Sequence, residues 1–191
     1  MQQIREIVAC MADEKCIISE DKIQQLEYIE EYVGLEPYIQ MNYTEISKVC
    51  FHMVHKPIIP DDSIPQKVKH IRDGRVRVPI KTSEFYAKRA SEPDEIKENL
   101  VGEYGLSNFE DPFTLANVLN CQFIKRDEAY KNRIGTFIVK VKYEEGDGLI
   151  GPVDEKGHFE FLPYKGFVLD NRIDEEFGYK HYEEFLNNEK E

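Results

Sequence analysis

Alternating apolar and polar residues mark the C-terminal part of the chain. In residues 136–143, apolar or aromatic side chains occupy every second position, and two lysines lie on the opposite face. A period of two predicts a half-buried strand. Residues 149–153 and 158–164 repeat the pattern after turns rich in Gly and Asp. Three short strands joined by tight turns predict an antiparallel β-meander.

A different spacing runs through the first 55 residues, where apolar side chains recur every three or four positions. That period predicts amphipathic helices. They cover 2–14, then 20–33 up to Gly34, then from Asn42 or Thr44 to about 55, with a connector over 35–41 that contains Pro37.

The middle of the chain mixes proline-rich and short periodic segments. The elements predicted there are one or two helical turns over 66–72, an exposed edge strand over 75–81, and helices over 82–90, from 93 to 102 or 105, and over 112–119. A strand over 121–125 and a closing helix over 174–188 complete the pattern.

Helices precede the strands instead of alternating with them, which favours an α+β fold. We expect an N-terminal helical subdomain, then an antiparallel β-meander capped by a helix. The predicted boundaries are a helical subdomain over 1–55, a basic connector with an edge strand over 56–90, and an α+β part over 91–191.

Charge is unevenly distributed over the 191 residues. The net charge is −12, yet residues 56–89 hold nine Lys/Arg against four Asp/Glu, so the remainder carries −17. A strongly acidic protein repels nucleic acid at long range, whereas a local basic segment still suits phosphate or an acidic partner.

The cellular compartment and the need for a cofactor are predicted from features that the sequence lacks. No apolar run approaches the ~20 residues of a membrane-spanning helix, and the first residues do not resemble a signal peptide. Four irregularly spaced cysteines suit reduced thiols better than a disulfide scaffold. We therefore expect a cytoplasmic protein without a membrane partner and predict no cofactor.

Five cations gather in the basic segment. They are Lys67, Lys69, Arg72, Arg75 and Arg77. A cationic strand face beside a long connector suits phosphate contacts or an acidic protein. The alternative is that an edge strand carries positive charge to prevent aggregation, or pairs with carboxylates of its own chain.

The predicted closing helix carries more aromatic residues than its packing requires. Phe177, Tyr182 and Phe185 form its apolar stripe, and the opposite face is acidic. The stripe either anchors a protein partner or packs on the sheet of the same chain.

Two sets of side chains have the residue types of metal sites. Asp147, Asp154, Lys156 and Glu160 have those of a metal-dependent phosphodiesterase, although Asp, Gly and Lys are also ordinary turn residues.

The second set is Cys50, His52 and His55, which are zinc-ligand types. Its spacing matches no standard zinc finger, and a buried thiol beside two surface histidines is the favoured interpretation. We therefore predict no catalytic or metal-ligating residue.

The common phosphate-binding, hydrolase and metalloprotease motifs are absent from the sequence. We therefore expect a non-catalytic interaction protein, such as an inhibitor, an adaptor or an assembly subunit. Its acidic surface would dock a basic protein partner, such as one that handles nucleic acid. The alternatives are a nucleic-acid-binding module that uses residues 66–81, and a metal-dependent phosphodiesterase.

Overall fold

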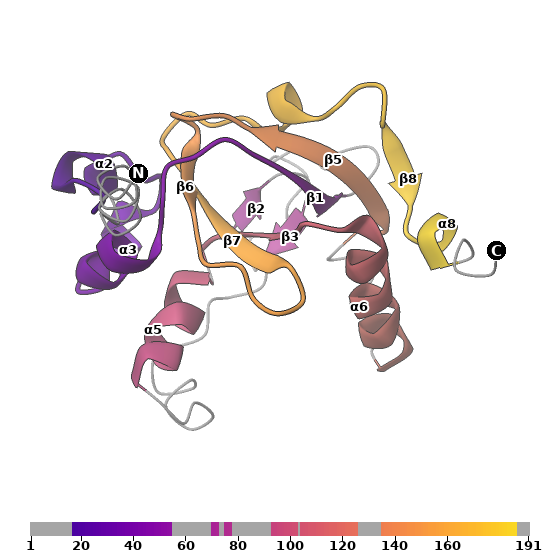
Figure 1. The fold of residues 1–191 in the computed structure, drawn as a ribbon, viewed down its shortest axis with the longest axis horizontal. Helices are drawn as coiled ribbons and strands as arrows, with labels where there is room; N and C mark the ends of the chain where they lie inside the picture. The colour runs from indigo at the N-terminus through magenta and orange to yellow at the C-terminus, as the bar shows by residue number, and fades with distance from the viewer. Residues whose placement is uncertain are drawn as a thin grey trace, which may run out of the picture.

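The fold is α+β, as the sequence predicts: helices lie before and after an antiparallel sheet of six strands (Figure 1). The computed structural model describes residues 17–54, 70–72, 75–77, 93–102, 104–125 and 135–186. The helices predicted over 2–14 and 82–90 and the connector over 56–65 lie outside these residues.

The described helices are α2 (Glu20–Gln24), η1 (Ile29–Glu31), α3 (Glu36–Asn42), α5 (Pro93–Gly102), α6 (Pro112–Lys125), η3 (Leu169–Arg172) and α8 (Glu183–Leu186), where η marks a 3-10 helix. The strands are β1 (Lys48–Val54), β2 (His70–Arg72), β3 (Arg75–Arg77), β4 (Leu106–Phe109), β5 (Phe137–Tyr143), β6 (Gly148–Ile150), β7 (His158–Pro163) and β8 (Tyr179–His181). A two-stranded hairpin, β2–β3, stands apart from the main sheet.

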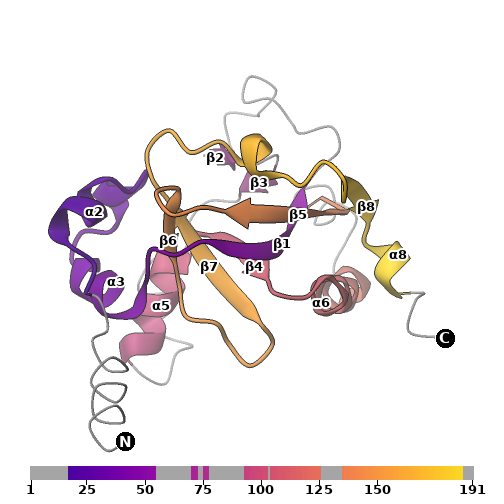
Figure 2. The same cartoon turned by 45° about the horizontal axis from the view of Figure 1, so that its top comes forward.

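Strand β1 lies inside the main sheet, whose order is β6-β7-β4-β1-β5-β8. Its whole length pairs with β5, from Lys48 opposite Tyr143 to Val54 opposite Phe137. Figure 2 shows these two strands side by side. A segment from the N-terminal third therefore completes a sheet otherwise built from residues after 105.

The three strands predicted for the meander all form, but only β6 and β7 pair with each other. Strand β5 lies beyond β4 and β1. Even so, the ring of Tyr143 on β5 stacks on Phe161 of β7, with ring centroids 3.8 Å apart. Three strand spacings would separate these strands by about 14 Å in a flat sheet, so the sheet curls around a core.

The helix predicted from Asn42 or Thr44 to about 55 is wrong, because most of that segment is the buried strand β1. Side chains on both faces of β1 are buried, so no alternation distinguished strand from helix. The helix α3 forms earlier, over the predicted connector. Pro37 lies in its first turn, where proline costs no hydrogen bond.

The helix predicted over 20–33 is interrupted after α2. Leu26 bridges to Tyr164 instead, and the Glu27 N–H donates to the Pro163 carbonyl at 2.9 Å. Pairing with the end of β7 thus replaces helical hydrogen bonds at this point.

Three other elements differ from the prediction. Residues 121–125 continue helix α6 and are not a strand, and 70–72 form a strand instead of a helical turn. The closing helix is confined to α8, since 179–181 pair with β5 as strand β8. Gly178 precedes that strand with φ +63°, a conformation that would interrupt a helix.

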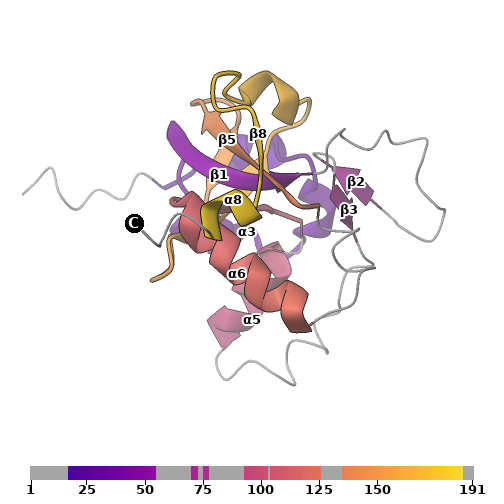
Figure 3. The same cartoon turned by 90° about the vertical axis from the view of Figure 1, so that its right-hand side faces the viewer.

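Helices cover the sheet at two places. Helices α6 and α8 lie side by side over one face, as Figure 3 shows, and their apolar side chains pack on Met53 and Ile138. Helices α2 and α3 pack at the other end, where Ile23, Leu26 and Ile39 meet the ends of β6 and β7.

We expect Phe161→Ala to lower the free energy of unfolding by ~3–5 kcal/mol, the usual cost of deleting a buried phenyl ring. Phe161 is fully buried and contacts both Tyr143 and Phe167. Urea unfolding measures the loss. Ile124→Ala is the control, because Ile124 is 77% exposed and should change stability by about 0.5 kcal/mol or less. Equal effects of the two substitutions would contradict the curled core.

Candidate functional site

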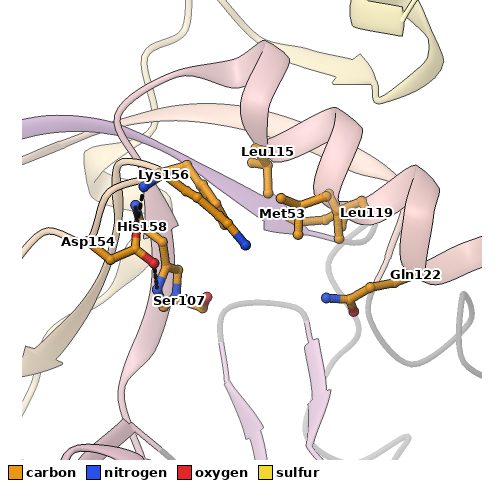
Figure 4. Close-up of a pocket in the computed structure, with 10 residues that line it drawn as sticks. Met53, Ser107, Leu115, Leu119, Gln122, Asp154, Lys156 and His158 are labelled. Carbon is orange, nitrogen blue, oxygen red and sulfur yellow. Dashed lines mark hydrogen bonds and ion pairs between the residues drawn. The ribbon is translucent and has the colours of Figure 1, made fainter.

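A pocket of about 420 Å³ lies between helix α6 and the strands β1, β4 and β7 (Figure 4). Its apolar lining consists of Met53, Phe109, Leu115, Val118 and Leu119. Its polar lining consists of Ser107, Gln122, Asp154, Lys156 and His158. Apolar walls with a few polar groups are typical of small-molecule sites.

A tight turn before β7 positions the polar side of the pocket. Asp154 Oδ1 accepts hydrogen bonds from the backbone N–H groups of Lys156 and His158, at 2.7 and 2.9 Å. Gly157 adopts φ +72°, which favours glycine. The turn therefore fixes where Lys156 leaves the backbone and where β7 begins.

Strand register then brings His158 against three polar side chains. Ser107 pairs with Glu160 across β4 and β7, so His158 lies diagonally across from Ser107. The His158 Nε2 atom is 2.7 Å from Ser107 Oγ and 3.3 Å from Glu160 Oε1. The Nδ1 atom is 3.8 Å from Asp154 Oδ2.

The charge of His158 follows from these neighbours. Burial lowers the pKa of His158. The hydrogen bond to Glu160 and the negative charges of Glu160, Asp154 and Glu98 raise the pKa by more than burial lowers it. The net pKa therefore lies above the ordinary value. The imidazolium form donates from Nε2 and from Nδ1 toward oxygen atoms that are already in place.

Ser107, His158 and Asp154 have the residue types of a hydrolase triad, but the arrangement does not favour nucleophilic catalysis. A general base must be unprotonated to accept the serine proton. Here Nε2 faces the carboxylate of Glu160 as well as the hydroxyl, and the raised pKa favours the protonated ring. The geometry suits holding a positive charge more than activating Ser107.

Lys156 supplies an ammonium group on the polar side of the pocket. Figure 4 shows its ammonium group projecting into the pocket, toward Gln122 on α6. Among the residues that the structure describes, no carboxylate lies within ion-pair distance of the Lys156 Nζ. Asp154 and Glu160 are instead engaged with His158.

The side chains of the phosphodiesterase hypothesis are only partly brought together. Asp154 and Lys156 line the pocket, and Glu160 lies beside it against His158. Asp147 accepts two hydrogen bonds from the Arg172 guanidinium, at 2.7 and 2.9 Å. Within the described ranges, no three His, Cys, Asp or Glu side chains are grouped to hold a metal ion.

The zinc hypothesis concerned side chains on the buried strand β1. The thiol of Cys50 donates to Asn108 Oδ1 at 3.5 Å, and burial raises its pKa. His52 is buried, not at the surface as expected, and its Nδ1 lies 2.8 Å from the Ser107 carbonyl oxygen. His55 lies outside the described residues.

Three of the predicted basic residues lie on the β2–β3 hairpin. Arg72 pairs with Arg75, and Arg77 pairs with His70. The strand at 75–77 is confirmed, whereas Lys67 and Lys69 fall outside the described residues.

The predicted docking aromatics pack within their own chain, the alternative considered above. Tyr182 and Phe185 are buried, with Tyr182 against Phe123 of α6. Phe177 is half-buried and packs against Phe51. They therefore join α8 to α6 and the sheet.

Apart from the pocket, the structure has an acidic surface near its N-terminal helices. Residues 17–47, here called the acidic lobe, contain seven Asp/Glu and one lysine, a net charge of −6. That lysine, Lys22, is bound to Glu45 at 2.8 Å. The lobe also exposes Ile17, Val33 and Met41, at 73%, 77% and 67%. A local charge count would have identified it from sequence.

Comparison of the chain with protein-family models, curated proteins and solved structures finds no match. Over the described residues, none of the helices has the length and apolar character needed to cross a lipid bilayer.

We expect the His158 pKa, measured by NMR titration, to exceed 6.5 and to fall in Glu160→Gln. Glu155→Gln is the control, because Glu155 is an exposed carboxylate in the same turn.

A raised folded-state pKa stabilises the fold below the unfolded pKa, and this stabilisation is lost as pH rises through the folded value. The stability advantage over His158→Gln should therefore be full below about pH 6.5 and shrink as the pH rises from there through the raised folded-state pKa of His158. A His158 pKa below 6.5 would contradict the assignment.

Proposed function

We propose that this chain is a non-catalytic interaction protein of the cytoplasm that docks a basic protein partner through its acidic lobe. The observation that carries the proposal is the combination of a net charge of −6 with three well-exposed apolar side chains in residues 17–47. Complementary charge speeds and orients encounter, while apolar contacts at the centre of an interface supply affinity.

The anchoring of the acidic lobe supports this role. Thr44 and Ile150 exchange two backbone hydrogen bonds, at 2.9 and 2.7 Å, and Ile23 and Leu26 are buried against the sheet. The inner side of the lobe is thereby occupied, while Glu20, Asp21 and Glu30 face solvent. Figure 1 shows α2 and α3 at the end of the molecule away from α6 and α8. A pre-formed surface loses little conformational entropy on binding.

Proteins that handle nucleic acid are one class with the required basic surface, because they neutralise phosphates with Lys and Arg. An acidic lobe can occupy such a surface in place of the phosphates. Direct nucleic-acid binding by this chain is the second candidate, favoured by the pairing of two arginine positions, Arg72 with Arg75, across the β2–β3 hairpin.

The first test is a pull-down from native host lysate, with and without nuclease, using the full chain and the variant Glu20→Lys/Asp21→Lys/Glu30→Lys. We expect a partner with net positive charge that survives nuclease, is released by high salt and is lost with the variant. Fluorescence anisotropy with the purified partner should then show affinity reduced at least ten-fold.

The matched control is Glu145→Lys/Glu175→Lys/Glu176→Lys, which changes the net charge equally at three exposed positions outside the lobe. It should retain the partner. Equal loss in both variants would mean that only net charge matters and would refute docking through the lobe. Loss of all partners on nuclease treatment would favour nucleic-acid binding.

A further inference from the structure

We propose that the pocket between α6 and the strands β1, β4 and β7 binds a small organic carboxylate with an apolar body, the carboxylate lying at Lys156. This site is separate from the acidic lobe and does not depend on the protein partner. The proposal rests on the pocket lining, on the placement of charges around His158 and on the pocket's size.

The placement of charge decides the sign of the ligand's polar group. Asp154 uses Oδ1 for two backbone N–H groups and directs Oδ2 toward His158, while Glu160 Oε1 lies 3.3 Å from the same ring. Each of these carboxylates thus directs one oxygen toward His158, and the other oxygen of Glu160, Oε2, is buried beside Gly105 without a hydrogen-bond partner in the described part of the chain. The ammonium of Lys156 instead projects into the pocket (Figure 4). An anion gains a charge-assisted hydrogen bond there, and a cation would be repelled.

The apolar wall of the pocket, opposite Lys156, determines the chemistry of the rest of the ligand. Leu115, Val118 and Leu119 present aliphatic side chains from α6, and Met53 and Phe109 complete the surface from the sheet. Burial of methylene groups against such a wall stabilises a complex, because it removes apolar surface from water. An anion without an apolar body, such as free phosphate, would leave this wall exposed to water.

Pocket size limits the length of the ligand. A volume of about 420 Å³ falls within the range of small-molecule sites. At roughly 30 Å³ for each heavy atom or water-sized group, it holds on the order of a dozen such groups. An aliphatic carboxylate of about ten carbons meets this limit.

The probe is decanoate, titrated into the full chain by isothermal calorimetry below its micelle-forming concentration, with 1-decanol and decyltrimethylammonium as probes of charge. We expect saturable one-to-one binding of decanoate, weaker binding of decanol and none of the cation. Lys156→Gln should weaken decanoate binding about five-fold, the scale of a partly exposed ion pair. Lys165→Gln is the matched control, because Lys165 is exposed and lies outside the pocket.

A second variant tests the location. Val118→Trp fills the pocket from a half-buried position on α6 and should abolish decanoate binding, whereas Ile124→Trp on the exposed side of the same helix should not. Urea unfolding of each variant verifies that the fold persists. Absence of saturable binding, equal binding of decanol and decanoate, or decanoate binding unaffected by Val118→Trp would each overturn the proposal. Partner capture through the acidic lobe can succeed or fail independently of these results.

Discussion

The seven-residue pairing of β1 with β5 is the interaction on which the rest of the structure depends. It inserts β1 between β4 and β5, so the sheet becomes continuous from β6 to β8. The two faces of β1 then serve different cores. Cys50 and Val54 point into the curl of the sheet, where Tyr143 and Phe161 stack, while Met53 faces helix α6. Without this pairing, neither core would close, and the pocket would lose part of its base.

The same sheet determines the chemistry of the pocket through register. A strand displaced by one residue turns its side chains to the opposite face. Ser107, His158 and Glu160 meet only because β4 and β7 pair Ser107 with Glu160. The result is a histidine ring held between carboxylates that raise its pKa, with Lys156 at the mouth of an apolar pocket. The acidic lobe adds an oppositely charged surface at another part of the molecule.

Sequence periodicity predicted those elements whose two faces differ in burial. Strand β5 and the beginnings of α5 and α6 follow from alternation or from proline at a helix start. Strand β1 was missed because both of its faces are buried, and the closing helix was overextended because β8 pairs with β5. At the pocket, the residue types of Asp154, Lys156 and Glu160 indicate a candidate site from the sequence alone. Ser107 and His158 were overlooked because pairing between strands distant in sequence cannot be derived from local pattern.

The position of β1 in the chain also has a consequence during synthesis. Its residues pair with partners 83 to 95 positions later, from Val54 with Phe137 to Lys48 with Tyr143. At a translation rate of 5–20 residues per second, β1 waits roughly 4 to 20 s before β5 has been made. Throughout that interval the apolar side chains of β1 lack their final neighbours on the nascent chain. The pairing of β1 with β5 therefore cannot begin until at least 83 further residues have been synthesised.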